Sequence, residues 1–261
     1  MKDWTQNMPS QESYAKLSAD LTGALSLAQP PIAISFADTV PAGVGTPSAR
    51  VAAGCRFWQD ASNESFATSS EDHSTCAIGV YTHNLESSAA QQTDLMDAVK
   101  VFGDLGYVRP EDLPLIPVLA TRPKYVVYAP LSETPLPPDV VLLLANSNQT
   151  LVLSEAAQQV EGGTPPAMGR PACAVIPQVA NTGRAALSLG CCGARAYLDV
   201  LTDDIALFAI PGAKLQAYVE RILALANANS VLTRFHVLRR KEIGAGGNPT
   251  VRQSLEAFMA S

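Results

Sequence analysis

The stretch that decides the fold is YVVYAPLSETPLPPDVVLLLA, residues 125–145. Its first part, Tyr125 to Tyr128, and its last part, Val140 to Leu144, are short runs of β-branched, aromatic and aliphatic residues that favour strands. Four prolines fall between the two runs, and proline cannot donate a backbone hydrogen bond to a sheet. The stretch therefore predicts two strands joined by a proline-rich connector.

Further strands and helices are predicted on both sides of this stretch. Strands are expected at 32–36, 65–68, 184–189 and 205–210. Helices are expected at 11–28, 55–61, 74–83, 91–105, 146–160, from 191 onward, at 213–228 and at 249–259. Strands and helices do not alternate strictly, so the pattern favours an α+β or mixed α/β fold. We expect a single compact domain over residues 1–261, with a mixed sheet flanked by helices and a C-terminal helical extension over about 230–261.

The composition limits the classes of partner. Hydrophobic residues make up 47% of the chain and charged residues only 16%, against about 25% in ordinary soluble proteins. So few charges are consistent with a surface that is covered in a homo-oligomer. The net charge of −6 argues against nucleic acid as a partner, because proteins that bind phosphate backbones are usually basic.

The sequence predicts a cytoplasmic protein that does not cross a membrane. The most apolar run, Val140 to Ala145, is far too short to span a bilayer. The first residues lack the basic and then apolar pattern of a secretory signal. Thiols stay reduced in the cytoplasm, so disulfides do not account for the five cysteines.

The cysteines stand where helices are expected to begin. Cys55 follows a glycine, Cys173 follows Gly169 and Pro171, and Cys191 and Cys192 lie between two glycines. A helix N-terminus carries about half a positive charge and favours thiolate over thiol. Thiolate is the form that binds metals or attacks electrophiles, so the pattern indicates a metal or redox site.

Four separated thiols match the ligand set of an iron–sulfur cluster. We expect Cys55, Cys76, Cys173 and Cys191 to bind a 4Fe-4S cluster, with Cys192 as a spare. The same four thiols would also fit tetrahedral zinc. Small buried cysteines that only pack the core remain the alternative without chemistry, because cysteine is among the most buried residue types.

Three polar residues are candidates for catalysis. His73 stands three residues before Cys76, and Arg56 directly follows Cys55. His73 could be a ligand or a proton donor, although a histidine beside two acidic residues is more often a surface residue. Arg195 and Arg184 flank the turn before Cys191, where they would hold an anionic substrate or form surface ion pairs.

These residues resemble a known family. The matching stretches are Cys55-Arg56-Phe57, Cys76-Ala77-Ile78-Gly79, Gly169-Arg170-Pro171-Ala172-Cys173-Ala174, Leu187-Ser188-Leu189-Gly190-Cys191-Cys192-Gly193-Ala194-Arg195 and Ala209-Ile210-Pro211-Gly212. Their order resembles the bacterial and archaeal family called domain of unknown function one-six-nine, or ArCR, over about residues 15–225. The resemblance implies that the four cysteines belong to one constellation, and it implies no particular reaction.

The leading hypothesis is an iron–sulfur protein that catalyses a redox reaction or transforms a small molecule. It would bind a small-molecule substrate, anionic if the arginines hold it, and would exchange electrons with a partner if the reaction is redox. One alternative is a non-catalytic module that is stabilised by zinc or binds a small ligand. The other is an enzyme with a nucleophilic cysteine, Cys76 or Cys191, in which His73 beside Cys76 is the only local base.

Overall fold

The central element of the computed structural model is one sheet, built from seven strands within the described residues 11–163, 165–169, 171–198 and 202–260. The strand order is β2-β3-β1-β4-β7-β6-β5. The strands are β1 (Ile32–Ala37), β2 (Phe66–Thr68), β3 (Tyr125–Pro130), β4 (Val140–Ala145), β5 (Ala167–Met168), β6 (Ala186–Ser188) and β7 (Ala206–Pro211). Only the β5–β6 pair is parallel among them. The sheet is therefore mixed, and the predicted α+β class in a single compact domain is confirmed.

The proline-rich connector carries the chain across β1. Strands β3 and β4 do not pair with each other; each pairs with β1 in antiparallel fashion, one on either side. The connector ends against Gly212, whose N–H donates to the carbonyl of Asp139 at 3.0 Å. A Cβ atom on Gly212 would lie only 1.7 Å from the carbonyl oxygen of Pro138. The pairing of β4 with β7 therefore depends on glycine at position 212, directly after β7.

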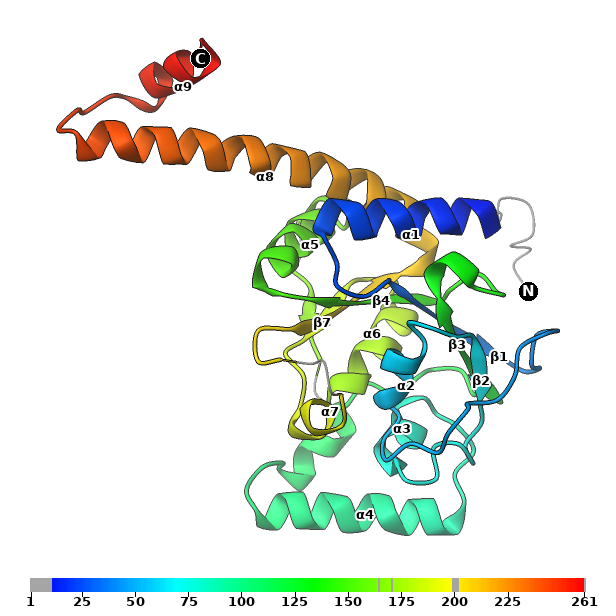
Figure 1. Ribbon diagram of the computed structural model, residues 1–261. Helices are drawn as coiled ribbons and strands as arrows, with labels where there is room; N and C mark the ends of the chain where they lie inside the picture. The colour runs from blue at the N-terminus through cyan, green and yellow to red at the C-terminus, as the bar shows by residue number, and fades with distance from the viewer. Residues whose placement is uncertain (1–10, 164, 170, 199–201, 261) are drawn as a thin grey trace.

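One face of the sheet is covered by long helices (Figure 1). They are α1 (Gln11–Leu25), α5 (Ser147–Val160) and the first part of α8 (Leu215–Gly244). Alternate residues of the strands point to this side because successive side chains in a strand alternate between faces. Val141, Leu143 and Phe208 are such residues, and they join one buried apolar cluster with the helices.

The other face is covered by short helices and turns (Figure 1). The helices are α2 (Arg56–Asp60), α3 (Ala77–Thr82), α6 (Val175–Thr182) and α7 (Cys192–Tyr197). The intervening strand residues, such as Ile34, Leu142 and Tyr128, join the second buried cluster. Helix α4 (Ala89–Asp104) lies farther out, beyond α3 (Figure 1).

Helix α8 is much longer than predicted. The sequence pattern predicted a helix over 213–228, but α8 continues to Gly244 and projects away from the sheet (Figure 1). No proline or glycine interrupts it before Gly244, so no local signal stops the helix. Helix α9 (Val251–Met259) packs back on α8, where the Phe235 and Phe258 rings lie 6.0 Å apart.

Among the described residues, no helix is both long enough and apolar enough to cross a membrane.

Candidate functional site

Four cysteines from distant segments lie on the face covered by short helices. Cys55, Cys76 and Cys191 each occupy the N-cap position of a helix, α2, α3 and α7. Cys173 lies in the short 3-10 helix η3 (Ala172–Ala174), which leads into α6. The predicted positions of Cys55, Cys173 and Cys191 at helix starts are therefore confirmed, whereas Cys76, predicted inside a helix over 74–83, lies just before α3. All four residues are partly buried.

Cys55, Cys76 and Cys173 lie close enough to other thiols of the group for those thiols to affect their pKa values. Burial raises the pKa of Cys55 to about 12, and the neighbouring charges of Cys76 and Cys191 add to this rise. Burial also raises the pKa of Cys173, with further contributions from the other three thiols. A charge acts on another group's pKa only at short range in a protein. The fold therefore brings together the cysteines that the sequence grouped as one constellation.

The expectation of thiolates at these helix starts is wrong for three of the four cysteines. Burial raises the pKa values of Cys55, Cys76 and Cys173. Backbone N–H groups at Gly54 and Gly79 lower the pKa of Cys76, but their effect is smaller than that of burial. The helices that follow Cys55 and Cys76 have only five and six residues, so their dipoles offset little of the desolvation cost.

Cys76 and His73 share a space that is lined by two glycines. A Cβ atom on Gly79 would lie 3.0 Å from Cys76 Sγ and 3.1 Å from His73 Nδ1. A Cβ atom on Gly54 would lie 2.8 Å from His73 Nδ1 and 3.8 Å from Cys76 Sγ. The thiol and the imidazole nitrogen therefore both lie close to the two glycines, and a larger residue at 54 or 79 would press on them.

His73 is a buried residue, contrary to the interpretation of a surface histidine. Only 1% of it is exposed, and its neighbour His83 is 2% exposed. His73 Nε2 lies 3.2 Å from Thr68 Oγ1, and His83 Nδ1 lies 2.9 Å from the carbonyl oxygen of Gly79. Burial lowers the pKa of His73 to about 3 and that of His83 to about 4, so both rings are neutral near pH 7.

Several buried polar atoms on this face have no hydrogen-bond partner among the described residues. They are His73 Nδ1, His83 Nε2, Tyr128 Oη and Trp58 Nε1. The Tyr128 hydroxyl lies near the thiols, because Cys173, Cys76 and Cys55 all contribute, after burial, to raising its pKa. Buried polar atoms usually have partners, so a concentration of exceptions marks a site that binds something polar.

The side chains are not arranged as a finished metal site. Within the described part of the chain, no three His, Cys, Asp or Glu side chains form a group that could hold a metal ion as they stand. Cys173 Sγ instead accepts a hydrogen bond from Thr82 Oγ1 at 3.5 Å, and Cys191 Sγ accepts one from the Ala194 N–H at 3.4 Å. Metal binding at these thiols would require new side-chain rotamers.

The candidate arginines are engaged in structural contacts. Arg56 Nε lies 3.3 Å from Asp60 Oδ1 within α2. Arg195 donates to the carbonyls of Leu189 and Thr202, both at 2.5 Å, and so braces the turns around α7. These contacts leave His73 as the sequence candidate that directly faces a cysteine.

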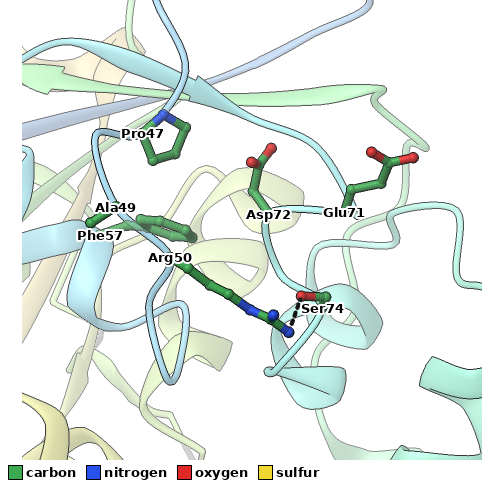
Figure 2. Close-up of a pocket in the computed structure, with 7 residues that line it drawn as sticks. All are labelled: Pro47, Ala49, Arg50, Phe57, Glu71, Asp72 and Ser74. Carbon is green, nitrogen blue, oxygen red and sulfur yellow. Dashed lines mark hydrogen bonds between the residues drawn. The ribbon is translucent and has the colours of Figure 1, made fainter.

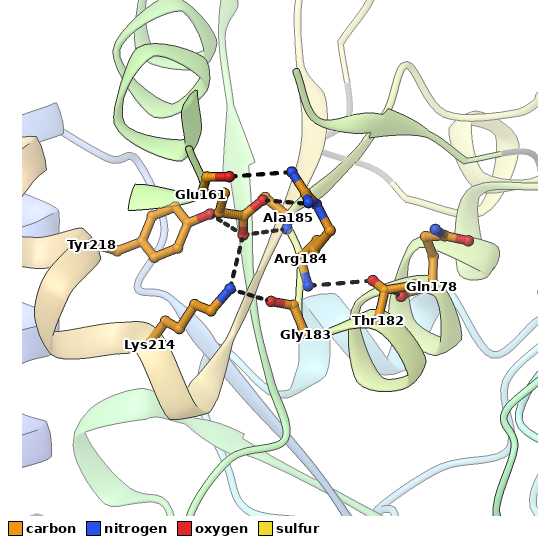
Figure 3. Close-up of polar contacts among 8 residues, drawn as sticks. All are labelled: Glu161, Gln178, Thr182, Gly183, Arg184, Ala185, Lys214 and Tyr218. Carbon is orange, nitrogen blue, oxygen red and sulfur yellow. Dashed lines mark hydrogen bonds and ion pairs between the residues drawn. The ribbon is translucent and has the colours of Figure 1, made fainter. Parts of the chain in front are cut away.

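Arg184 belongs to an ion-pair network at the edge of the other face (Figure 3). Its Nε lies 3.7 Å from Glu161 Oε2, and the Glu161 side chain is only 2% exposed. Lys214 and the Tyr218 hydroxyl also contact Glu161, at 3.9 Å and 2.6 Å. Of the two predicted roles of Arg184, the ion pair is therefore confirmed.

Two adjoining pockets open on the surface outside the histidines. The first has a volume of about 340 Å³ (Figure 2), and its lining residues are Pro47, Ala49, Arg50, Phe57, Glu71, Asp72 and Ser74. Phe57 also contacts His73 edge-on, with ring centroids 5.1 Å apart. The second pocket, about 730 Å³, shares Glu71 and Ser74 with the first.

Sequence reasoning missed several residues of this site. Gly79 ends one of the quoted motifs and Gly54 directly precedes another, but nothing in those motifs showed that a histidine would pack against both. His83 and Tyr128 carry no local signal, because one ends a short helix and the other reads as an ordinary strand residue. Only a long-range contact pattern could have found them.

Comparison with known proteins gives one family. The model of the DUF169 family, described as uncharacterised ArCR, matches residues 20–221. This range agrees with the predicted resemblance over about 15–225. Comparison with the curated proteins and with the solved structures gives no match.

Proposed function

We propose that this chain, which belongs to the uncharacterised ArCR family, holds an iron–sulfur cluster in its cysteine pocket. Cys55, Cys76, Cys173 and Cys191 would be the ligands. The observation that carries the proposal is the gathering of four thiols from four segments: Cys55, Cys173 and Cys191 pack against one buried cluster of the core, and Cys76 acts on the pKa values of Cys55 and Cys173. Such a set matches the four-thiolate ligation of a 4Fe-4S cluster.

The chemistry of the pocket is compatible with such a centre. The Tyr128 hydroxyl and the Trp58 N–H are buried, lack partners among the described residues, and could donate to sulfur. Phe57, Trp58 and Ile176 belong to the buried apolar cluster against which Cys55, Cys173 and Cys191 pack. Because burial raises the pKa values of three of the thiols, metal binding would release protons.

A cluster in this position would supply electron transfer or a Lewis-acidic iron. The chain's own residues would exclude water and orient a small-molecule substrate. Of the three catalytic candidates we retain His73, because its Nδ1 shares a space with Cys76 whereas Arg56 and Arg195 have structural partners. A cytoplasmic location, an electron-transfer partner if the reaction is redox, and a homo-oligomer complete the proposal.

Anaerobic purification followed by iron and sulfide analysis tests the cluster. We expect brown protein with about four irons per chain, as a 4Fe-4S cluster requires. Separate Cys→Ser variants at positions 55, 76, 173 and 191 should each lose iron. Cys192→Ser is the matched control, because Cys192 is exposed and lies beside a proposed ligand. Colourless, iron-free protein after anaerobic reconstitution would refute the proposal.

Zinc is the second candidate, and the position of His73 favours it. A neutral imidazole beside Cys76 is the donor that a mixed cysteine and histidine zinc site uses. Elemental analysis would then find zinc in colourless protein, and chelation would lower the melting temperature. A nucleophilic cysteine is less favoured, because the raised pKa of Cys76 keeps it protonated near pH 7. Selective labelling of one cysteine by iodoacetamide near neutral pH would reverse that preference.

A further inference from the structure

The hydrogen bond of His83 defines which ring nitrogen carries its proton. Its Nδ1 lies 2.9 Å from the carbonyl oxygen of Gly79. A carbonyl oxygen can only accept, so Nδ1 carries the proton and donates it. Nε2 is then a lone-pair nitrogen, and it is buried without a partner among the described residues. His83 therefore presents a hydrogen-bond acceptor in the protein interior.

His73 is held in the opposite tautomer by Thr68. The Thr68 hydroxyl donates to the carbonyl of Val126 at 3.3 Å, so its oxygen accepts from His73 Nε2 at 3.2 Å. A hydroxyl has one proton, which the Val126 carbonyl already receives. His73 Nδ1 is therefore a second lone-pair nitrogen, also buried and without a partner in the described part of the chain.

The two acceptors lie in adjacent rings. The ring centroids of His73 and His83 are 5.9 Å apart. Gly79 lies beside both rings: a Cβ atom there would lie 3.1 Å from His73 Nδ1, and its carbonyl oxygen accepts from His83 Nδ1. A buried polar atom without a partner loses its hydrogen bonds to water and gains none in exchange, which costs stability. A small ligand that donates hydrogen bonds to both nitrogens would recover this cost.

The surface outside the histidines is acidic. The first pocket is lined by Phe57, which contacts the His73 ring, and its described lining carries Glu71 and Asp72 beside Arg50 (Figure 2). The guanidinium of Arg50 donates to Ser74 Oγ at 3.2 Å. The second pocket adds Glu86 and Asp94, and its described lining includes no Lys, Arg or His. This surface attracts cations and repels anions.

We infer that His73 and His83 bind a small molecule that is rich in N–H or O–H donors and is uncharged or cationic. Ammonium and simple amides are the smallest members of this class. The inference names the substrate class of the proposed centre, and its catalytic meaning rests on that function. It differs from the expectation of an anionic substrate, because Arg56 and Arg195 already have structural partners.

Nitrogen NMR of the histidine rings tests this directly. The chain has only three histidines, so histidine-selective ¹⁵N labelling gives few signals. Ammonium and formamide should each shift the signals of His73 Nδ1 and His83 Nε2, whereas formate should shift neither. The exposed His236 serves as the internal reference. The full chain is measured free of metal, so a lack of iron binding leaves the outcome readable.

Three variants sharpen the test. Glu71→Gln should weaken ammonium binding about two- to fivefold, the range of an exposed charge interaction, and should leave formamide binding unchanged. Glu12→Gln is the matched control, because Glu12 is exposed on α1 at the opposite face. Thr68→Val should abolish the response of His73 and retain that of His83.

Two results would overturn the inference. One is a pair of protonated nitrogens at His73 Nδ1 and His83 Nε2 in the free protein. The other is an equal response to formate and to ammonium, or a response that His236 shares.

Discussion

The two faces of the sheet are built from the same strands but differ in how their polar atoms are treated. On the face under α1, α5 and α8, Phe208, Leu143 and their neighbours form a buried apolar cluster, and Thr150 Oγ1 on α5 is a buried polar atom without a partner among the described residues. The buried carboxylate there, Glu161, has Arg184, Lys214 and Tyr218 as partners (Figure 3). On the opposite face, two histidines, a tyrosine and a tryptophan keep buried polar atoms without partners among the described residues.

This difference indicates that the two faces of the sheet have different roles. Long helices bury much apolar area, and each buried aliphatic or aromatic side chain contributes roughly 1.5–3 kcal/mol. Unpartnered polar atoms each cost about 1–3 kcal/mol. A protein tolerates such costs at functional sites when the rest of the core offsets them. We therefore assign stability to one face and chemistry to the other.

The largest predicted effect is a loss of stability in acid that originates from the site face. Burial lowers the pKa values of His73 and His83 to about 3 and about 4, below the value of about 6.5 in an unfolded chain. As the pH falls, the unfolded chain binds these protons first, so the stabilisation is complete above pH 6.5 and is lost towards pH 4. Each histidine should contribute about 1.4 kcal/mol per pH unit in that window.

Urea denaturation of the metal-free chain between pH 7.5 and 4.5 measures this slope. His83→Gln should reduce it by about half. A free energy of unfolding that stays constant across the window would contradict the assignment of neutral, buried imidazoles.

The next effect is the removal of a large side chain from the hydrocarbon face. Phe208→Ala should lower the free energy of unfolding by about 3–5 kcal/mol, because the side chain is fully buried between β7 and the helices. Metal content per folded molecule should not change. A variant that folds but loses its metal would show that the two faces are not separable.

A smaller effect separates two glycines. Gly54→Ala should lower stability by about 1–3 kcal/mol, the usual cost of overpacking, and should abolish metal binding, since its Cβ would lie 2.8 Å from His73 Nδ1. Gly23→Ala is the matched control on α1, where a Cβ would meet nothing within 4 Å. That control should gain roughly 0.5–1 kcal/mol from helix propensity. Thermal melts and metal analysis of both variants test this difference. Equal melting temperatures and equal metal contents of the two variants would contradict the close packing of Gly54 against His73.

The smallest effect concerns the Tyr128 hydroxyl. Tyr128→Phe should leave the stability of the metal-free chain unchanged or raise it by up to about 1 kcal/mol, because the hydroxyl has no partner among the described residues. If the hydroxyl donates to the bound centre, the absorption spectrum of the loaded protein should shift. A loss of more than about 1 kcal/mol in the metal-free chain would mean that the hydroxyl has a structural partner.

The local parts of the fold were predictable because they depend on neighbours in the sequence. The β-branched runs at Tyr125 to Tyr128 and Val140 to Leu144 predicted β3 and β4, and the structure confirms both. The order of the motifs predicted the family, which the match over residues 20–221 confirms. The predicted length of α8 was wrong, because no local sequence signal marks where a helix extends beyond the surface on which it packs.

Sequence alone determined β1, β2, β3, β4, β6 and β7, the placement of Cys55, Cys173 and Cys191 at helix starts and the family, all of which follow from patterns within a few residues. Only the tertiary structure decided that β1 lies between β3 and β4, and that Gly54 and Gly79 enclose His73 and Cys76. It also decided the pKa of Cys76, since burial raises that pKa more than the backbone N–H groups of Gly54 and Gly79 lower it. The physical reason is that desolvation depends on every segment that covers a side chain, and those segments lie far away along the chain.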